Sequence, residues 1–203
     1  MAKPSAGKRR IIFVTDGDDI ARKAVEKAVS NIGGRCISAS AGNPTPISGQ
    51  QLIDLVKKAN HDPVVVMVDD RGSCRKGKGE EVLEYVAQHP DIEVIGVLAV
   101  ASNTESIEGI HVDYAVTKNK EVVDVPVDKC GNPAYNSDAL MGDTVDVLNE
   151  LEDVIPVVVG IGDIGKMEGK DSAYKGAEIT TKALELVIKN WEARQCDHNN
   201  TTV

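Results

Sequence analysis

Aspartate residues follow three apolar runs of this sequence, at the points where those runs end. The runs are residues 11–14, 63–68 and 156–161. Carboxylate oxygens are the ligands that Mg²⁺ and Ca²⁺ prefer in proteins, and carboxylates at strand ends are typical of phosphoryl-transfer domains of the receiver or Toprim type. Capping of the helix that follows is the alternative for Asp18, because Asp is a good N-cap residue. The candidate metal ligands are Asp16, Asp18, Asp69, Asp70 and Asp163.

A glycine-rich, cationic segment follows the second of these runs. The spacing Gly72-x-x-x-x-Gly77-Lys78 matches a phosphate-binding loop between a strand and a helix, where backbone amides can hold an anion. Residue 79 is Gly instead of Ser or Thr, so the hydroxyl that would bind Mg²⁺ in an NTPase is missing. Fixed positive charge here suits a small anion or an acidic partner surface, and a solvated loop is the alternative. The candidate anion-binding residues are Arg71, Gly72, Arg75, Lys76, Gly77 and Lys78.

No catalytic residue is assigned from the remaining motifs. Residues 160–165 match G-x-G-x-x-G, but no βαβ unit follows them, so a tight turn explains the glycines better than a dinucleotide site. The four cysteines are far apart and the four histidines show no spacing typical of a triad or a metal site. The absence of a complete catalytic motif favours a non-enzymatic protein over an enzyme.

The elements that must position these residues alternate between strands and helices. Apolar runs at residues 11–15, 63–69 and 92–101 predict strands, and residues 35–40 are a further strand candidate. Helical periodicity follows the first three of these segments in chain order, at 20–32, 49–59 and 80–89. The run at 63–69 has no polar alternation, which is typical of a parallel strand covered on both faces. A helix opening at Ser137, a strand at 156–161 and a helix from about Ser172 complete the pattern. We expect a Rossmann-like or flavodoxin-like α/β fold with a mostly parallel sheet.

Two segments depart from this alternation. Residues 102–136 contain alternating apolar residues around a polar turn and read as a β-hairpin insertion. Residues after 194 are polar and are expected to form a disordered tail. We therefore expect a single domain at residues 1–194, with the insertion at about 102–136 and a tail at 195–203.

Composition excludes two classes of protein. Lys and Arg number 23 against 32 Asp and Glu, and aromatic residues make up 3%; this argues against a nucleic-acid binder, which needs a basic face and stacking side chains. The longest apolar run, residues 94–101, is far shorter than the roughly 20 residues of a membrane-spanning helix. We expect neither a transmembrane segment nor a signal peptide.

Four segments carry a resemblance to a known family. They begin at residues 13, 66, 136 and 159 and read FVTDGDDIARKA, VMVDDRG, NSDALMGD and VGIGDIGKME. In them, and over about residues 8–194, the chain resembles the soluble form of the stage V sporulation protein AE family of spore-forming bacteria. The resemblance implies a soluble accessory protein of the machinery that moves dipicolinic acid across the inner membrane of the spore. It implies a location in the spore, peripheral to that membrane, with membrane proteins of the dipicolinic acid channel as partners. No catalytic residues can be transferred from the family.

Three hypotheses follow. The first is the accessory protein that docks on membrane partners and supports sporulation and germination. The alternative is a Mg²⁺-dependent phosphoryl-transfer or phosphate-binding domain that uses Asp16, Asp69 and Asp70. A third is that the cationic loop binds dipicolinate or another small anion, since its arginines suit carboxylates.

Overall fold

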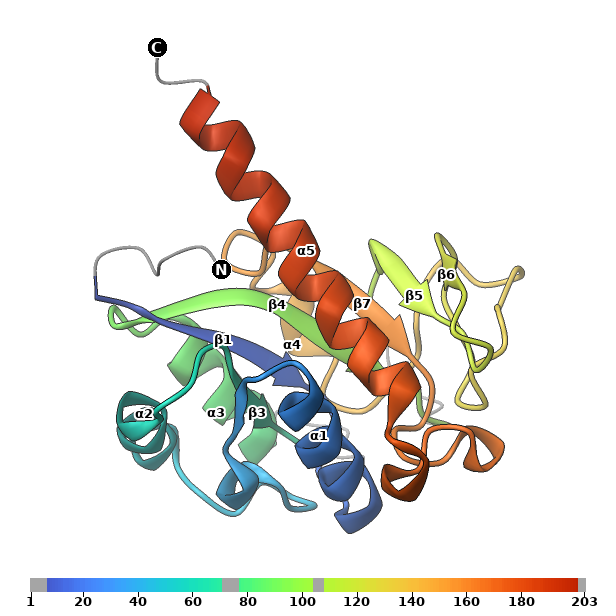
Figure 1. Cartoon of the computed structure of the whole chain (residues 1–203), viewed down its shortest axis with the longest axis horizontal. Helices are drawn as coiled ribbons and strands as arrows, with labels where there is room; N and C mark the ends of the chain where they lie inside the picture. Colours follow the sequence, from blue (N-terminus) through green and yellow to red (C-terminus); the bar gives the residue numbers. More distant parts are fainter. Residues whose placement is uncertain (1–6, 71–76, 104–107, 201–203) are drawn as a thin grey trace.

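The computed structural model describes residues 7–70, 77–103 and 108–200. Its strands form one seven-stranded sheet in the order β2-β3-β1-β4-β7-β5-β6 (Figure 1). All paired strands are parallel except β5 and β6. The strands are β1 (Arg9–Val14), β2 (Arg35–Cys36), β3 (Val64–Met67), β4 (Ile92–Val100), β5 (Tyr114–Val116), β6 (Val122–Val123) and β7 (Val158–Ile161). The helices are α1 (Asp19–Asn31), α2 (Gly49–Lys58), α3 (Lys78–Ala87), α4 (Asp146–Asn149) and α5 (Glu178–Asn200), with 3₁₀ turns η1 (Ser38–Ser40), η2 (Met167–Gly169) and η3 (Ala173–Lys175).

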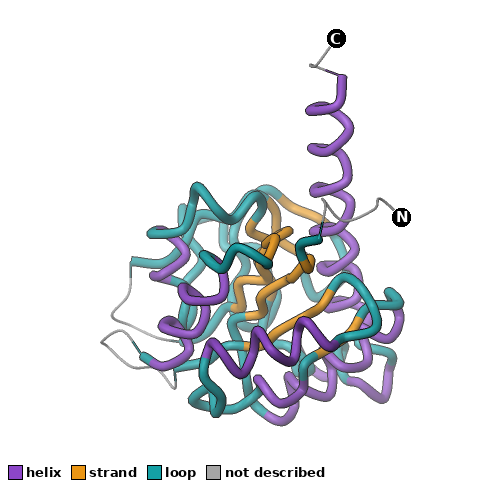
Figure 2. Tube along the Cα trace, turned by 90° about the vertical axis from the view of Figure 1, so that its left-hand side faces the viewer, coloured by secondary structure: helices purple, strands orange, loops and turns teal. Residues whose placement is uncertain are grey.

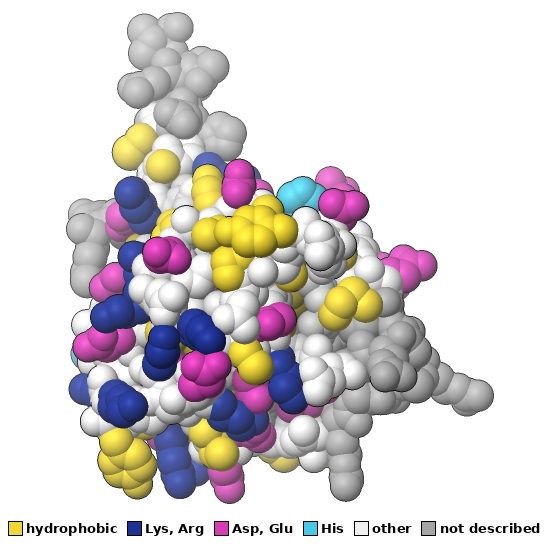
Figure 3. Space-filling model, turned by 90° about the vertical axis from the view of Figure 1, so that its right-hand side faces the viewer, with side chains coloured by type: hydrophobic (Ala, Val, Ile, Leu, Met, Phe, Trp, Pro, Cys, Tyr) yellow, Lys and Arg dark blue, Asp and Glu magenta, His cyan; other side chains and the backbone are white. Residues whose placement is uncertain are grey.

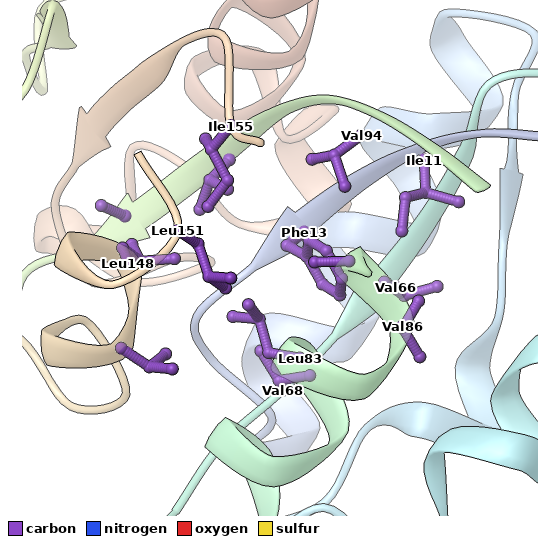
Figure 4. Packing of buried hydrophobic residues seen from close by; sticks show 14 of the residues in the cluster. Ile11, Phe13, Val66, Val68, Leu83, Val86, Val94, Leu148, Leu151 and Ile155 are labelled. Carbon is purple, nitrogen blue, oxygen red and sulfur yellow. The ribbon is translucent and has the colours of Figure 1, made fainter. Parts of the chain in front are cut away.

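Helices cover both faces of the sheet. The apolar side chains of α1 and α5 pack on one face, and those of α2, α3 and α4 pack on the other. Figure 2 shows the strands lying between helices. In β1, Ile11 and Phe13 point to the α2/α3 side while Ile12 and Val14 point to the α1/α5 side, and all four are fully buried. Figure 4 shows Phe13 in the first of these clusters, together with side chains from β3, β4 and α3. The apolar runs are continuous because each strand has two covered faces.

The order of the strands determines where a ligand can bind. From β1 the chain passes to β2 and β3 on one side, and then to β4 on the other side of β1. In open α/β sheets, ligands bind beyond the carboxyl ends of strands, where connections leave in opposite directions. The carboxyl ends of β1, β3 and β4 form such an edge here, and β7 extends it.

The predicted α/β fold with a mostly parallel sheet is confirmed, and so is the β-hairpin. The hairpin consists of β5 and β6, and it is joined to the main sheet because β5 pairs in parallel with β7. No helix among the described residues is both long enough and apolar enough to cross a membrane.

The helix predicted from Ser137 is wrong over its first part, since only α4 is helical in this region. The backbone of Leu140 instead exchanges hydrogen bonds with Ile110, at 3.0 and 2.8 Å. Gly142 lies so close to Val100 that a Cβ would come within 2.2 Å of its carbonyl oxygen. This long-range pairing satisfies the backbone of Leu140 in place of helical hydrogen bonds.

The last helix differs from the prediction at both ends. It begins at Glu178 because Ser172 to Gly176 form a 3₁₀ turn that ends in a left-handed glycine, with φ of 97°. It continues to Asn200, six residues into the segment predicted to be a disordered tail. Its end projects from the body of the protein (Figures 1 and 2). Once a helix is anchored, as here by the buried Trp191, each further residue adds a hydrogen bond without needing tertiary contacts.

Candidate functional site

A polar pocket of about 160 Å³ opens at the carboxyl ends of β1, β3, β4 and β7. Thr15 at the end of β1 and Ser102 after β4 contribute hydroxyl groups to its wall. The other lining side chains are mostly charged, and the charges have both signs. The carboxylates are Asp16, Asp18, Asp69, Asp143 and Asp163, and the ammonium groups are Lys129 and Lys166.

Asp16 has the most perturbed carboxyl group in this pocket. Burial raises its pKa to about 7, and the negative charges of Asp18 and Asp69 act in the same direction. The backbone N–H of Asp18, at 3.2 Å from Asp16 Oδ1, and the charge of Lys166 partly oppose this rise in the pKa. A carboxyl group that titrates near neutral pH can accept and return a proton, which is what general acid–base chemistry requires.

Asp69 is held in place by the backbone around it. It is 5% exposed, and its Oδ2 accepts a hydrogen bond of 3.1 Å from the N–H of Gly17. Its own N–H donates to Thr45 Oγ1 at 2.9 Å, and its carbonyl accepts from the N–H of Thr45. Gly17 must lack a side chain, because a Cβ would lie 2.3 Å from the Gly42 carbonyl oxygen and 2.9 Å from Asp69 Cβ. The loop after β1 can therefore approach Asp69 closely only with glycine at this position.

Lys166 forms ion pairs with two carboxylates, one three residues away in the chain and one 148 residues away. Its Nζ lies 2.7 Å from Asp18 Oδ2 and 2.8 Å from Asp163 Oδ1. Burial alone would lower the pKa of Lys166, but these two hydrogen bonds outweigh it and the pKa is raised. Lys166 is therefore a permanent cation at the rim of the pocket, placed between two of the predicted metal ligands.

Asp18 also caps α1, as the alternative interpretation of this residue predicts. Its Oδ1 accepts hydrogen bonds from the N–H groups of Ile20 and Ala21, both at 2.8 Å. Burial would raise the pKa of Asp18, but the ammonium of Lys166 and these two amides together lower it. Asp18 is thus an ionised capping residue that also faces the pocket.

Asp70 lies next to the pocket in sequence but does not line it. Its carboxylate accepts hydrogen bonds from the N–H groups of Gly79 and Glu80, and so caps the N-terminus of α3. Burial raises the pKa of Asp70 more than these bonds lower it. The role of this residue is to hold α3 against the end of β3.

The predicted anion-binding loop is only partly described by the structure. Arg71, Gly72, Arg75 and Lys76 lie outside the described residues, so their assignment stays a prediction. Of the remaining two, Gly77 precedes α3, and the Nζ of Lys78 donates to the carbonyl of Pro46 at 2.8 Å. Lys78 therefore connects α3 to the loop before α2.

The metal-ligand assignment likewise stays a prediction. The structure brings Asp16, Asp18, Asp69 and Asp163 to one pocket and places Asp70 at a helix cap. Within the described parts of the chain, no three His, Cys, Asp or Glu side chains are grouped so that they could hold a metal ion. The arrangement as it stands offers a proton-exchanging carboxyl group and fixed charges of both signs to a small polar ligand.

Several lining residues were not predicted from the sequence. Ser102 follows β4 as Asp16 follows β1, so the same reasoning about strand ends could have found it. Its hydroxyl donates to Asp143 Oδ1 at 3.2 Å. Asp143, Lys129 and Asn43 lie instead in long loops that reach the pocket. Nothing in the local sequence of those loops indicates that they fold toward it.

The glycine motif at residues 160–165 is explained by packing. A Cβ at Gly160 would come within 2.8 Å of Leu140, and one at Gly162 within 2.7 Å of the Gly131 nitrogen. Gly165 has φ of 77° and lies against the carbonyl oxygen of Ile20 in α1. These glycines bring the loop after β7 close to its neighbours, and this places Asp163 and Lys166 at the pocket.

Comparisons with known proteins give one match. The family model described as "SpoVAE: Stage V sporulation protein AE1" matches residues 10–190. That range includes all residues that line the pocket. No curated protein and no solved structure matches the chain.

Proposed function

This chain belongs to the stage V sporulation protein AE family, and we propose that it is an accessory protein of the machinery that moves dipicolinic acid across the inner membrane of the spore. In this proposal it acts on the surface of that membrane, by docking on membrane proteins of the dipicolinic acid channel. The observation that supports the proposal is the family match, which extends over residues 10–190 and ties the protein to sporulation.

The pocket suggests which kind of ligand the protein binds in this role. It is small, polar and open, and it combines carboxylates with two lysines. A group such as Asp16, which changes charge near neutral pH, makes the affinity for a charged ligand depend on pH. We propose that the pocket binds a small charged molecule of this process and that occupancy is communicated to the membrane partner.

The proposed function is tested in a spore former whose gene for this protein is deleted. The deletion strain should contain less dipicolinic acid in its spores, or release it more slowly during germination. Complementation with the wild-type gene should restore the dipicolinic acid content and its release. The Asp69→Asn gene should not, because it replaces the carboxylate that accepts the Gly17 N–H in the pocket by a neutral amide. Asp124→Asn is the matched control, since Asp124 is exposed and does not line the pocket. Unchanged dipicolinate content and release in the deletion strain would refute the proposed role.

A Mg²⁺-dependent phosphoryl-transfer or phosphate-binding domain is the second candidate. It is favoured by one observation: Asp16 and Asp69, from two strands, line one pocket together with Lys166. If this is the function, Mg²⁺ with phosphate or acetyl phosphate should raise the melting temperature, because a ligand of the native state stabilises it by mass action. Asp16→Asn should abolish the increase. The absence of any increase with Mg²⁺, Ca²⁺, phosphate or acetyl phosphate would rule this candidate out.

The cationic loop is tested separately by calorimetry with dipicolinate. If the loop binds this dianion, the double replacement Arg71→Ala and Arg75→Ala should remove the heat of binding. Retention of the full signal by that variant would show that dipicolinate binds elsewhere.

A further inference from the structure

A second surface feature lies at the opposite end of the strands from the pocket. Two hollows, of about 330 and 440 Å³, open where β4 and β7 begin and beside the C-terminal part of α5. They adjoin each other, because both are lined by Glu152, Ile155, Pro156 and Arg194. We call the combined feature the α5 groove.

Apolar residues form part of the lining of the α5 groove, beside polar ones. Val94, Ile155 and Trp191 line the first hollow, and Ile110, Leu148 and Val158 line the second. Val154 at the rim is 38% exposed, which is high for a large aliphatic side chain. Figure 3 shows hydrophobic side chains gathered in the upper part of one face, with acidic side chains and a histidine beside them. Apolar surface in a groove of this kind can receive an apolar side chain from a partner.

The walls of the α5 groove are acidic. Four carboxylates line it, together with the side chains of Arg194 and His111. Two of the four are engaged within the protein: Glu93 accepts a hydrogen bond from Trp191 Nε1 at 3.2 Å, and Asp113 accepts one from the Val158 N–H at 2.8 Å. The other two, Glu152 and Asp153, are exposed on the loop before β7. An approaching partner therefore meets negative charge beside the apolar side chains of the groove.

We propose that the α5 groove binds a basic segment of a partner protein that carries apolar side chains between its lysines or arginines. Its charge is complementary to the carboxylates, which steer and orient a partner, and its apolar side chains fill the two hollows. The proposal rests on the proposed function in one respect: a membrane partner supplies such segments, because Lys and Arg are in excess next to the cytoplasmic ends of membrane-spanning helices. An anionic lipid surface is not the occupant, because the carboxylates would be repelled by it.

The proposal is tested first with a defined probe. A fluorescein-labelled peptide, Lys-Lys-Leu-Leu-Lys-Lys-Leu-Leu-Lys, is titrated with the full chain, and its anisotropy is measured. The double variant Glu152→Lys, Asp153→Lys should bind about tenfold more weakly than the wild type. Its matched control is Glu121→Lys, Asp124→Lys, which changes the net charge equally at two exposed positions outside the groove. The control variant should keep most of the affinity for the peptide. The comparison separates the effect of the net charge from the effect of the charges in the groove.

Two further probes distinguish other occupants. A peptide with Ser in place of Leu should bind about tenfold more weakly if apolar side chains enter the hollows, and vesicles of phosphatidylglycerol should not bind. The proposal would be overturned if the two double variants bound the peptide with equal affinity. It would also be overturned if the wild type bound the vesicles and the groove variant did not. Both variants should keep the wild-type melting temperature, since the substituted side chains are exposed.

A measurement in the spore separates this proposal from the proposed function. The groove variant should lose its association with the spore membrane fraction, while the control variant keeps it. If deletion of the gene changes dipicolinate release but the groove variant stays on the membrane, the groove proposal fails and the proposed function stands. If deletion has no effect on dipicolinate, the proposed function fails and the peptide titration alone decides the binding property of the groove.

Discussion

Replacement of Asp16 by Asn should change how the stability of the protein depends on pH. Burial raises the pKa of Asp16 from an ordinary 3.8 to about 7 in the folded state. The folded protein therefore holds this proton more tightly than the unfolded chain does. Where the folded state binds more protons, the free energy of unfolding falls as the pH rises. Asp16 thus costs no stability at low pH and costs most above neutral pH, when its carboxylate is charged and buried.

The size of the effect follows from the two pKa values. The difference between 3.8 and about 7 corresponds to about 4 kcal/mol at about 1.4 kcal/mol per pH unit. This cost develops between about pH 4 and pH 7 and is constant above that range. Asn has nearly the shape of the protonated acid and carries no charge, so Asp16→Asn should be close to wild type at pH 4. Between pH 4.5 and pH 8 its advantage in the free energy of unfolding should grow by about 3 kcal/mol.

Urea unfolding of the two proteins at several pH values from 4.5 to 8 measures this difference. Other groups that titrate in this range contribute equally to both proteins, so they cancel in the comparison. The exposed control Asp124→Asn should stay within about 0.5 kcal/mol of wild type throughout. A constant gap between Asp16→Asn and the wild type over this pH range would show that Asp16 does not titrate as its burial requires.

Three further substitutions test how the pocket is built. Asp171 is fully buried and accepts hydrogen bonds from the N–H groups of Gly165, Ile179 and Thr180 and from the Thr180 hydroxyl. Asp171→Ala should therefore lower the melting temperature by about 10 °C in calorimetry. A change below about 2 °C would contradict this role. Lys166→Met should destabilise the protein by about 1–2 kcal/mol in urea at low salt and by less in 1 M NaCl, because salt screens ion pairs that are partly open to solvent. A loss of stability that does not depend on salt would point to packing. Gly17→Ala should cost about 1–3 kcal/mol in the same assay, since its Cβ would overlap the Gly42 carbonyl oxygen, and wild-type stability would mean that this loop can move.

The sequence was most informative where neighbouring residues determine the structure. The apolar run at 63–68 forms a strand buried on both faces, as its lack of polar alternation predicts. Ser48 and Gln51, three residues apart, form a capping box at the start of α2, and Asp18 caps α1. In these cases the hydrogen-bond partner or the covering surface belongs to the same or the next element, so local spacing is sufficient.

The sequence was least informative where a loop takes its structure from a distant part of the chain. Residues 137–145 carry apolar side chains at helical spacing, yet Leu140 pairs with Ile110 and Thr144 has φ of 58°. Asp171 was not singled out, although it is fully buried and holds both the loop after β7 and the start of α5. Its acceptor role depends on donors that only the folded chain brings to it.

The residues at the pocket show this division clearly. The sequence alone indicates that Asp16 and Asp69 follow buried parallel strands, and parallel strands present their carboxyl ends at one edge of a sheet. The folded chain was needed to show that Lys166 reaches Asp18, 148 residues away in the sequence. It also shows that Asp70 caps α3 and that Asp143 lines the pocket. The physical reason is that a strand or a helix cap depends on residues close in sequence. The environment of a charged side chain depends instead on burial and on partners that only strand order and loop packing bring together.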